Sequence, residues 1–279
     1  MSHYTRTQAL EFAHMCQNAS LEDILAYAEN QAVTNTGKAW KEYFGKLASW
    51  LKGGELAAVI FNLSGNTKLP FAAFSTLPIV TCPGAGECKQ YCYSLRAWRY
   101  PAAFIRQAQN TIALRFFRRQ VIEAFKVLPQ NVTFRLYVDG DFDSVQTVNF
   151  WFNLLRQRQD VETYGYSKSW TELLAVPNWP KNYILNLSTG GIGTEEQKQQ
   201  LKQLWNTRGE FIVVRIKGKF GRGFKRYQEI EYHRAVRQSA IDSGIGKVFS
   251  CPGSCGSCTG AGHACGLVSL SLPIAIGVH

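Results

Sequence analysis

The chain has 279 residues, of which 46% are apolar and 18% charged, and this composition excludes an intrinsically disordered protein. Its net charge of +11 favours polyanionic partners, above all nucleic acid. The sequence contains no apolar segment typical of a secretion signal or long enough to span a membrane. We therefore expect a cytoplasmic protein in which clustered cysteines bind metal rather than form disulfides.

Residues 1–54 are predicted to form a helical cap over one end of the core. Ser20 is followed three residues later by Asp23, which resembles a capping box, and apolar residues then recur at helical spacing. A second apolar stripe begins at Trp40 and ends before Gly53. This pattern indicates two amphipathic helices.

From residue 55 to residue 279, short apolar runs alternate with helical segments. We expect strands at 56–63, 71–80, 132–138, 161–167, 183–187, 211–216 and 248–250, and helices at 101–128, 144–159, 171–175, 194–205 and 227–243. Such alternation is typical of a parallel sheet built from βαβ units. About six units predict an α/β protein with a partial or complete parallel βα barrel, whose chemistry gathers where the strands end.

Seven of the eight cysteines lie in two loops that both begin with Cys-Pro-Gly and both follow a predicted strand. The first cysteine loop, residues 81–93, contains Cys82, Cys88 and Cys92. The second cysteine loop, residues 251–265, contains Cys251, Cys255, Cys258 and Cys265. Thiolates are soft ligands that suit iron–sulfur clusters and zinc. Three ligands leave one coordination position open, as in a catalytic site, whereas four can close a structural or electron-relay site.

These thiolates predict one or two iron–sulfur clusters, most simply of the [4Fe–4S] type, and zinc is the alternative metal. Two separate clusters and one cluster shared by both loops are both compatible with the sequence. His263 could replace Cys265 as a ligand, although a lone histidine in a glycine-rich loop is more often a bystander. Cys16 lies on a predicted amphipathic helix, where packing is the simplest role.

Five further residues at predicted strand ends are candidates for cofactor binding. Asp139 and Asp141 form an acidic turn after the strand at 132–138, and Lys168 follows the next strand. Gly190 and Gly191 precede a helix N-terminus, whose free N–H groups can bind phosphate or carboxylate. The alternatives are a solvated turn, an exposed lysine and an ordinary tight βα turn.

Two basic sets are interleaved with aromatic or glycine residues and predict contact with nucleic acid. Cations suit the phosphate backbone, and rings stack on unpaired bases. The first set lies beside the first cysteine loop and the second lies in a glycine-rich loop; the candidates are Arg96, Trp98, Arg99, Lys217, Lys219, Arg222, Lys225 and Arg226. The alternative is a pair of solvated faces.

The first cysteine loop, the stretch Tyr164-Gly-Tyr-Ser-Lys-Ser169 and the second cysteine loop are similar to the phage and plasmid gene product 88 family, over about residues 60–270. This resemblance implies an origin in a mobile genetic element. A βα barrel with a three-cysteine loop after an early strand also resembles the radical-SAM superfamily. The usual C-x3-C-x2-C spacing of that superfamily occurs here only at Cys251, Cys255 and Cys258. The second resemblance implies SAM bound near Asp139 and Asp141.

Three hypotheses follow from these patterns. The first is an iron–sulfur protein that binds nucleic acid, with SAM-dependent radical chemistry if the open iron binds SAM. The second is a non-catalytic DNA- or RNA-binding module with a structural or redox-sensing cluster. The third is a zinc-stabilised interaction protein. Metal analysis and reductive cleavage of SAM distinguish among them.

Overall fold

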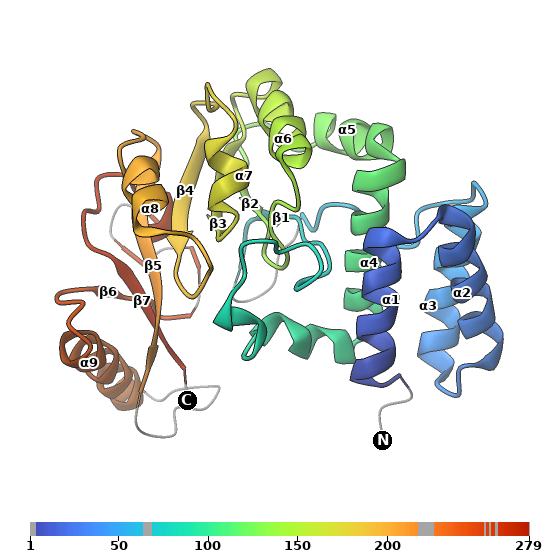
Figure 1. Cartoon of the computed structure of the whole chain (residues 1–279), viewed down its shortest axis with the longest axis horizontal. Helices are drawn as coiled ribbons and strands as arrows, with labels where there is room; N and C mark the ends of the chain where they lie inside the picture. Colours follow the sequence, from blue (N-terminus) through green and yellow to red (C-terminus); the bar gives the residue numbers. More distant parts are fainter. Residues whose placement is uncertain are drawn as a thin grey trace.

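The computed structural model of the chain describes residues 4–63, 69–216, 226–253, 255–256, 258–259 and 262–278. Within this part of the chain, seven parallel strands form one sheet that curls into a half-barrel, with helices packed on its outer side (Figure 1). The strand order is β1-β2-β3-β4-β5-β7-β6. The strands are β1 (Ala72–Ala73), β2 (Thr133–Leu136), β3 (Glu162–Ser167), β4 (Tyr183–Ser188), β5 (Thr207–Arg215), β6 (Phe249–Ser250) and β7 (Ile274–Val278). The predicted partial parallel barrel is confirmed.

The N-terminal segment forms three helices rather than the two predicted: α1 (Arg6–Asn18), α2 (Leu21–Thr34) and α3 (Lys38–Leu51). The additional helix begins at a capping box, in which Thr5 and Gln8 satisfy each other's backbone N–H groups. Ser20 caps α2 as expected, by accepting a hydrogen bond from the Asp23 N–H. The cap packs against α4 (Pro101–Phe116), away from the sheet (Figure 1).

Several predicted boundaries were wrong. The segment 56–63 forms no strand among the described residues, and its Asn62 forms an isolated antiparallel bridge to Ala73. The single helix predicted at 101–128 is divided at Phe117 into α4 and α5 (Arg118–Lys126). Strand β7 was not predicted. The remaining helices are α6 (Val145–Gln157), α7 (Trp170–Leu174), α8 (Glu195–Lys202) and α9 (Arg226–Asp242).

The two faces of the sheet have different partners because side chains alternate along each strand. On the outer face, Phe134 and Leu136 of β2 join the large core beneath the helices. On the inner, concave face, Tyr164 and Tyr166 of β3 pack with the second cysteine loop. The concave face therefore carries a second, smaller core, in which cysteines take part.

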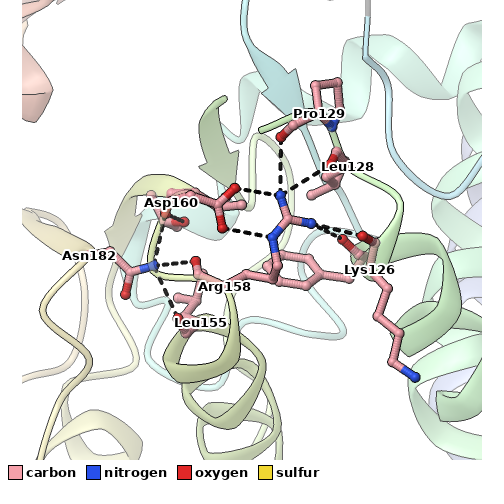
Figure 2. Close-up of polar contacts among 10 residues, drawn as sticks. Lys126, Leu128, Pro129, Leu155, Arg158, Asp160 and Asn182 are labelled. Carbon is pink, nitrogen blue, oxygen red and sulfur yellow. Dashed lines mark hydrogen bonds and ion pairs between the residues drawn. The ribbon is translucent and has the colours of Figure 1, made fainter. Parts of the chain in front are cut away.

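The amino end of the sheet is fixed by a polar cluster centred on Arg158 and Asn182 (Figure 2). Arg158 forms a two-pronged ion pair with Asp160, at 2.6 and 2.7 Å, and this hydrogen bonding lowers the pKa of Asp160 to about 2. Its guanidinium also donates to backbone carbonyls at the end of α5, those of Lys126, Leu128 and Pro129. Asn182 donates to the carbonyls of Leu155, Arg158 and Val161. These contacts join α5, α6 and the starts of β3 and β4.

No helix in the described part of the chain has the length and apolar character that a membrane span requires.

Candidate functional site

The first cysteine loop lies at the carboxyl edge of the sheet, over the loops that follow β3 and β4. The Gly84 carbonyl accepts a hydrogen bond from the Ile192 N–H at 2.9 Å, and the Cys88 N–H donates to the Gly190 carbonyl at 3.2 Å. A Cβ at Gly84 would lie only 1.8 Å from the Lys168 carbonyl oxygen, so glycine is required there. The structure thus brings Lys168 and Gly190, two predicted cofactor-binding residues, against the first cysteine loop.

Gly191 and Lys168 complete this contact. Gly191 forms an antiparallel bridge with Ala85 of the loop. Lys168 is half-buried rather than exposed, and its Nζ donates to the Ser188 Oγ at the end of β4 at 2.5 Å. Gly190 and Gly191 therefore make backbone contacts with the first cysteine loop, and Lys168 donates its hydrogen bond to the end of β4.

Asp141 is buried, not part of a solvated turn. Its carboxylate accepts hydrogen bonds from the Ser167 Oγ at 2.7 Å and from the N–H groups of Lys168 at 2.7 Å and Phe142 at 2.8 Å. Burial nevertheless raises the pKa of Asp141 above the ordinary range of a carboxyl group. Burial, and then the negative charge of Asp141, raise the pKa of the Cys82 thiol. Asp141 thus holds the end of β3 in place directly beside the first cysteine loop.

Asp139 is connected, through two buried side chains, to the short helix that follows the first cysteine loop. Gln107 donates to the Asp139 Oδ2 at 2.9 Å and accepts at 3.0 Å from the Trp98 Nε1. Burial raises the pKa of Asp139 as well. Trp98 is only 4% exposed and packs edge-on against Phe104, so its predicted role as a base-stacking residue was wrong. Its bulk fills the core under the short helix η2 (Tyr93–Arg99) instead.

The second cysteine loop lies against the concave face of the sheet. The Tyr166 hydroxyl contacts the Cys265 Sγ at 2.6 Å, and the Asn186 amide donates to the Cys265 carbonyl at 3.0 Å. The Ala264 N–H donates to the Cys258 Sγ at 3.2 Å. The His263 ring, at the far end of the loop, lies 4.9 Å from that of Phe71, just before β1. The loop therefore crosses the interior of the half-barrel.

All eight cysteines are free thiols. Burial raises the pKa of Cys251 to about 12, and the charges of Cys265, Cys255 and Cys258 add to this effect, so the other three thiols of the second loop lie within electrostatic range of Cys251. In the first loop, burial raises the pKa of Cys82 and of Cys92. The charge of Cys92 adds to the rise at Cys82, and the charge of Cys88 adds to the rise at Cys92.

The described residues contain no group of three His, Cys, Asp or Glu side chains close enough to hold a metal ion. The cysteines thus fit a thiolate-bound metal in donor type and number, but the described residues do not gather them into a ligand set. The two loops also do not join into one group, because the first lies at the carboxyl edge and the second on the concave face.

Two arginines on the concave face, the buried Arg208 and the half-buried Arg135, were missed by sequence reasoning. Arg208 is satisfied, since its guanidinium donates to the Asn186 Oδ1 at 2.6 Å and to backbone carbonyls. Arg135 of β2 lies 4.7 Å from the ring centre of Tyr166, but its buried Nε makes no hydrogen bond in the described part of the chain. The cation–π contact, worth about 0.5–2 kcal/mol, stabilises the guanidinium but gives its Nε no hydrogen-bond partner. The alternation of β2 was the signal that could have found Arg135.

Apart from the buried Trp98, the predicted nucleic-acid residues are either exposed or outside the described part of the chain. Arg96 and Arg99 are exposed. Lys217, Lys219, Arg222 and Lys225 lie outside the described residues, and Arg226 begins α9 with a side chain that is also outside them. Around the two exposed arginines, three tyrosines are exposed by 45 to 63%. We call this set the basic aromatic surface; it consists of Tyr91, Tyr93, Arg96, Arg99 and Tyr100.

Comparison with known protein families identifies the family of the chain. A family model described as gene product 88 matches residues 34–217. The chain belongs to the gene product 88 family. The family match contains the first cysteine loop and the carboxyl-edge residues around it, whereas the second cysteine loop lies outside the matched span, although the sequence resemblance was expected to extend to about residue 270. No curated protein and no solved structure matched the chain.

Proposed function

We propose that this member of the gene product 88 family is an iron–sulfur protein with a cluster bound by the first cysteine loop. The observation that supports this is the position of the loop: three free thiols are carried on backbone hydrogen bonds over the carboxyl ends of β3 and β4. Ligands at that edge of a parallel barrel are placed where such folds perform chemistry. Cys82, Cys88 and Cys92 would supply three thiolates, and a cluster bound by three thiolates has one iron open to another ligand.

The second cysteine loop is proposed to hold a second thiolate-bound centre, enclosed in the small core of the concave face. Cys251, Cys255, Cys258 and Cys265 supply four donors, which suits a closed structural or electron-relay site. Backbone N–H groups already donate to the sulfurs of Cys251 and Cys258, and such donors stabilise a thiolate.

Anaerobic reconstitution with iron and sulfide tests the proposal, with iron content and visible absorption as readouts. We expect a coloured protein whose iron content falls in a Cys82→Ala, Cys88→Ala, Cys92→Ala triple variant. Cys16→Ala is the matched control, because that thiol is buried in the helical cap. A colourless protein with stoichiometric zinc, or full iron content in the triple variant, would overturn the proposal. Reductive cleavage of SAM by the reduced protein distinguishes an enzyme from a binding module.

We also propose that the basic aromatic surface binds single-stranded nucleic acid. Its exposed tyrosines offer stacking platforms beside Arg96 and Arg99, and the chain has a net charge of +11. Fluorescence anisotropy with an oligonucleotide at several salt concentrations tests this. In an Arg96→Ala, Arg99→Ala variant, affinity should fall and the salt slope should decrease by roughly 1.4, about 0.7 per lost phosphate contact. The control, Lys38→Ala with Lys41→Ala, removes the same charge from exposed positions of α3. Equal losses in both variants would contradict a specific surface.

A further inference from the structure

The concave face contains three buried polar atoms that have no hydrogen-bond partner of ordinary geometry among the described residues: the Arg135 Nε, the Tyr164 hydroxyl and the His263 Nδ1. The Tyr164 hydroxyl nevertheless faces the thiol of Cys255. Arg135 and Tyr164 are direct partners in the register of β2 and β3, so their side chains leave the sheet on the same face. The His263 ring lies 4.6 Å from that of Tyr164. Three unsatisfied groups are thus in one place.

Buried polar groups are nearly always hydrogen-bonded, so each exception needs an explanation. All three can donate: a guanidinium only donates, a phenol can donate, and an imidazole donates from Nδ1 in one tautomer. Arg135 also takes part in no ion pair among the described residues. The acidic groups within electrostatic range of it are Asp139, the thiols Cys255 and Cys265, and the phenol of Tyr93. A positive charge and convergent donors are the features that recognise an oxyanion.

We propose that Arg135, Tyr164 and His263 form a binding site for a small oxyanion, a phosphate or carboxylate group of a ligand, on the concave face of the half-barrel. The aromatic rings of Phe71 and Tyr166 form its apolar walls, through contacts with His263 and Tyr164. This site adjoins the second cysteine loop, but its test is separate from that of the iron–sulfur proposal, because anion binding to the metal-free protein is measured independently of iron content.

Arg106 and Tyr183 provide matched controls for Arg135 and Tyr164. The Nε of Arg106, on α4, is also buried and makes no hydrogen bond in the described part of the chain. Unlike Arg135, however, Arg106 belongs to no cluster of unsatisfied donors among the described residues. It therefore serves as a matched control for the loss of a half-buried arginine. Tyr183 serves the same purpose for Tyr164, since it is a fully buried tyrosine of the neighbouring strand β4 that belongs to the core of the outer face.

Isothermal titration of the purified chain with inorganic phosphate, and separately with acetate, tests the site. We expect saturable binding of at least one of them at one per chain, and the better ligand identifies phosphate or carboxylate as the natural group. Arg135→Gln should weaken binding about tenfold or more, and Tyr164→Phe about threefold. Arg106→Gln and Tyr183→Phe should leave affinity within about twofold of the wild type.

If Arg135→Gln fails to fold, Tyr164→Phe decides the question, because it removes only one hydroxyl group. The proposal is overturned if neither anion binds saturably, as expected if a thiolate of the second cysteine loop is the partner of Arg135. It is also overturned if Tyr164→Phe and Arg135→Gln bind the anion as tightly as their controls do.

Discussion

The two cysteine loops begin with the same tripeptide but lie in opposite electrostatic surroundings. Burial raises the pKa of both Cys82 and Cys265, the latter to about 11. The charge of Asp141 then raises that of Cys82 further, whereas the charges of Arg135 and Arg208 lower that of Cys265. Burial therefore opposes ionisation of both thiols, and the nearest charged side chain adds to this opposition at Cys82 but reduces it at Cys265. Surroundings, rather than the Cys-Pro-Gly motif, determine how readily each loop loses its thiol protons.

The largest expected effect is a difference in stability between glycine variants of the two Cys-Pro-Gly turns. Gly84→Ala places a Cβ 1.8 Å from a backbone oxygen of Lys168, which must move, and this should cost about 3 kcal/mol or more of unfolding free energy. Gly253→Ala meets no atom within 4 Å and should cost only about 1–2 kcal/mol, because its φ of 74° is strained for alanine. Urea denaturation measures both. A larger loss for Gly253→Ala would reverse the order we assign to the loops.

A smaller difference in unfolding free energy is expected when one cysteine from each loop is replaced by alanine. Cys265→Ala removes a buried side chain and leaves the Tyr166 hydroxyl without its contact at 2.6 Å, which should cost about 2 kcal/mol. Cys88 is partly exposed and its Sγ accepts no hydrogen bond among the described residues, so Cys88→Ala should cost less than about 0.5 kcal/mol. Both free energies should be measured on metal-free protein under reducing conditions. Similar values for the two variants would argue against the packed interior position of the second loop.

The smallest expected effect concerns the buried carboxyl group of Asp139. Since burial raises its pKa in the folded chain, the folded state binds a proton at a higher pH than the unfolded state does. The contribution of Asp139 to stability therefore increases as the pH falls from 7 towards the ordinary pKa of aspartate. Asp139→Asn should remove this dependence, so wild type should gain stability relative to the variant at pH 5. Parallel pH curves for the two proteins would show that Asp139 does not titrate in this range.

Much of the fold could be predicted from local pattern. Strands β2 to β5 and the helices between them were expected because each is long enough to show its own periodicity. Strands β1 and β6 have two residues each, so their partners rather than their sequence define them. The break at Phe117 was missed because α4 and α5 continue one apolar pattern across a single non-helical residue.

The candidate site likewise contains features that local pattern predicted and features that it did not. The meeting of Lys168, Gly190 and the first cysteine loop at the carboxyl edge was expected, because parallel strands bring the loops that follow them to the same edge of the sheet. The second cysteine loop also follows a predicted strand and was expected at the same edge, but it lies against the concave face. Its course depends on long-range contacts such as that of His263 with Phe71, which local pattern does not show. Arg135 was missed because a charge within a strand is usually solvent-facing.

The position of β7 has a consequence for the order of folding. Strands β1 to β5 are neighbours in the sheet in the order in which they occur in the chain, so they can pair one after another. Strand β7 lies between β5 and β6, and β6 pairs with no other strand in the described part of the chain. Until residues 274–278 arrive, the nine-residue strand β5 keeps one edge open to pairing with other chains. The second cysteine loop joins β6 to β7, so its cysteines can reach their final positions only in the last step of sheet assembly.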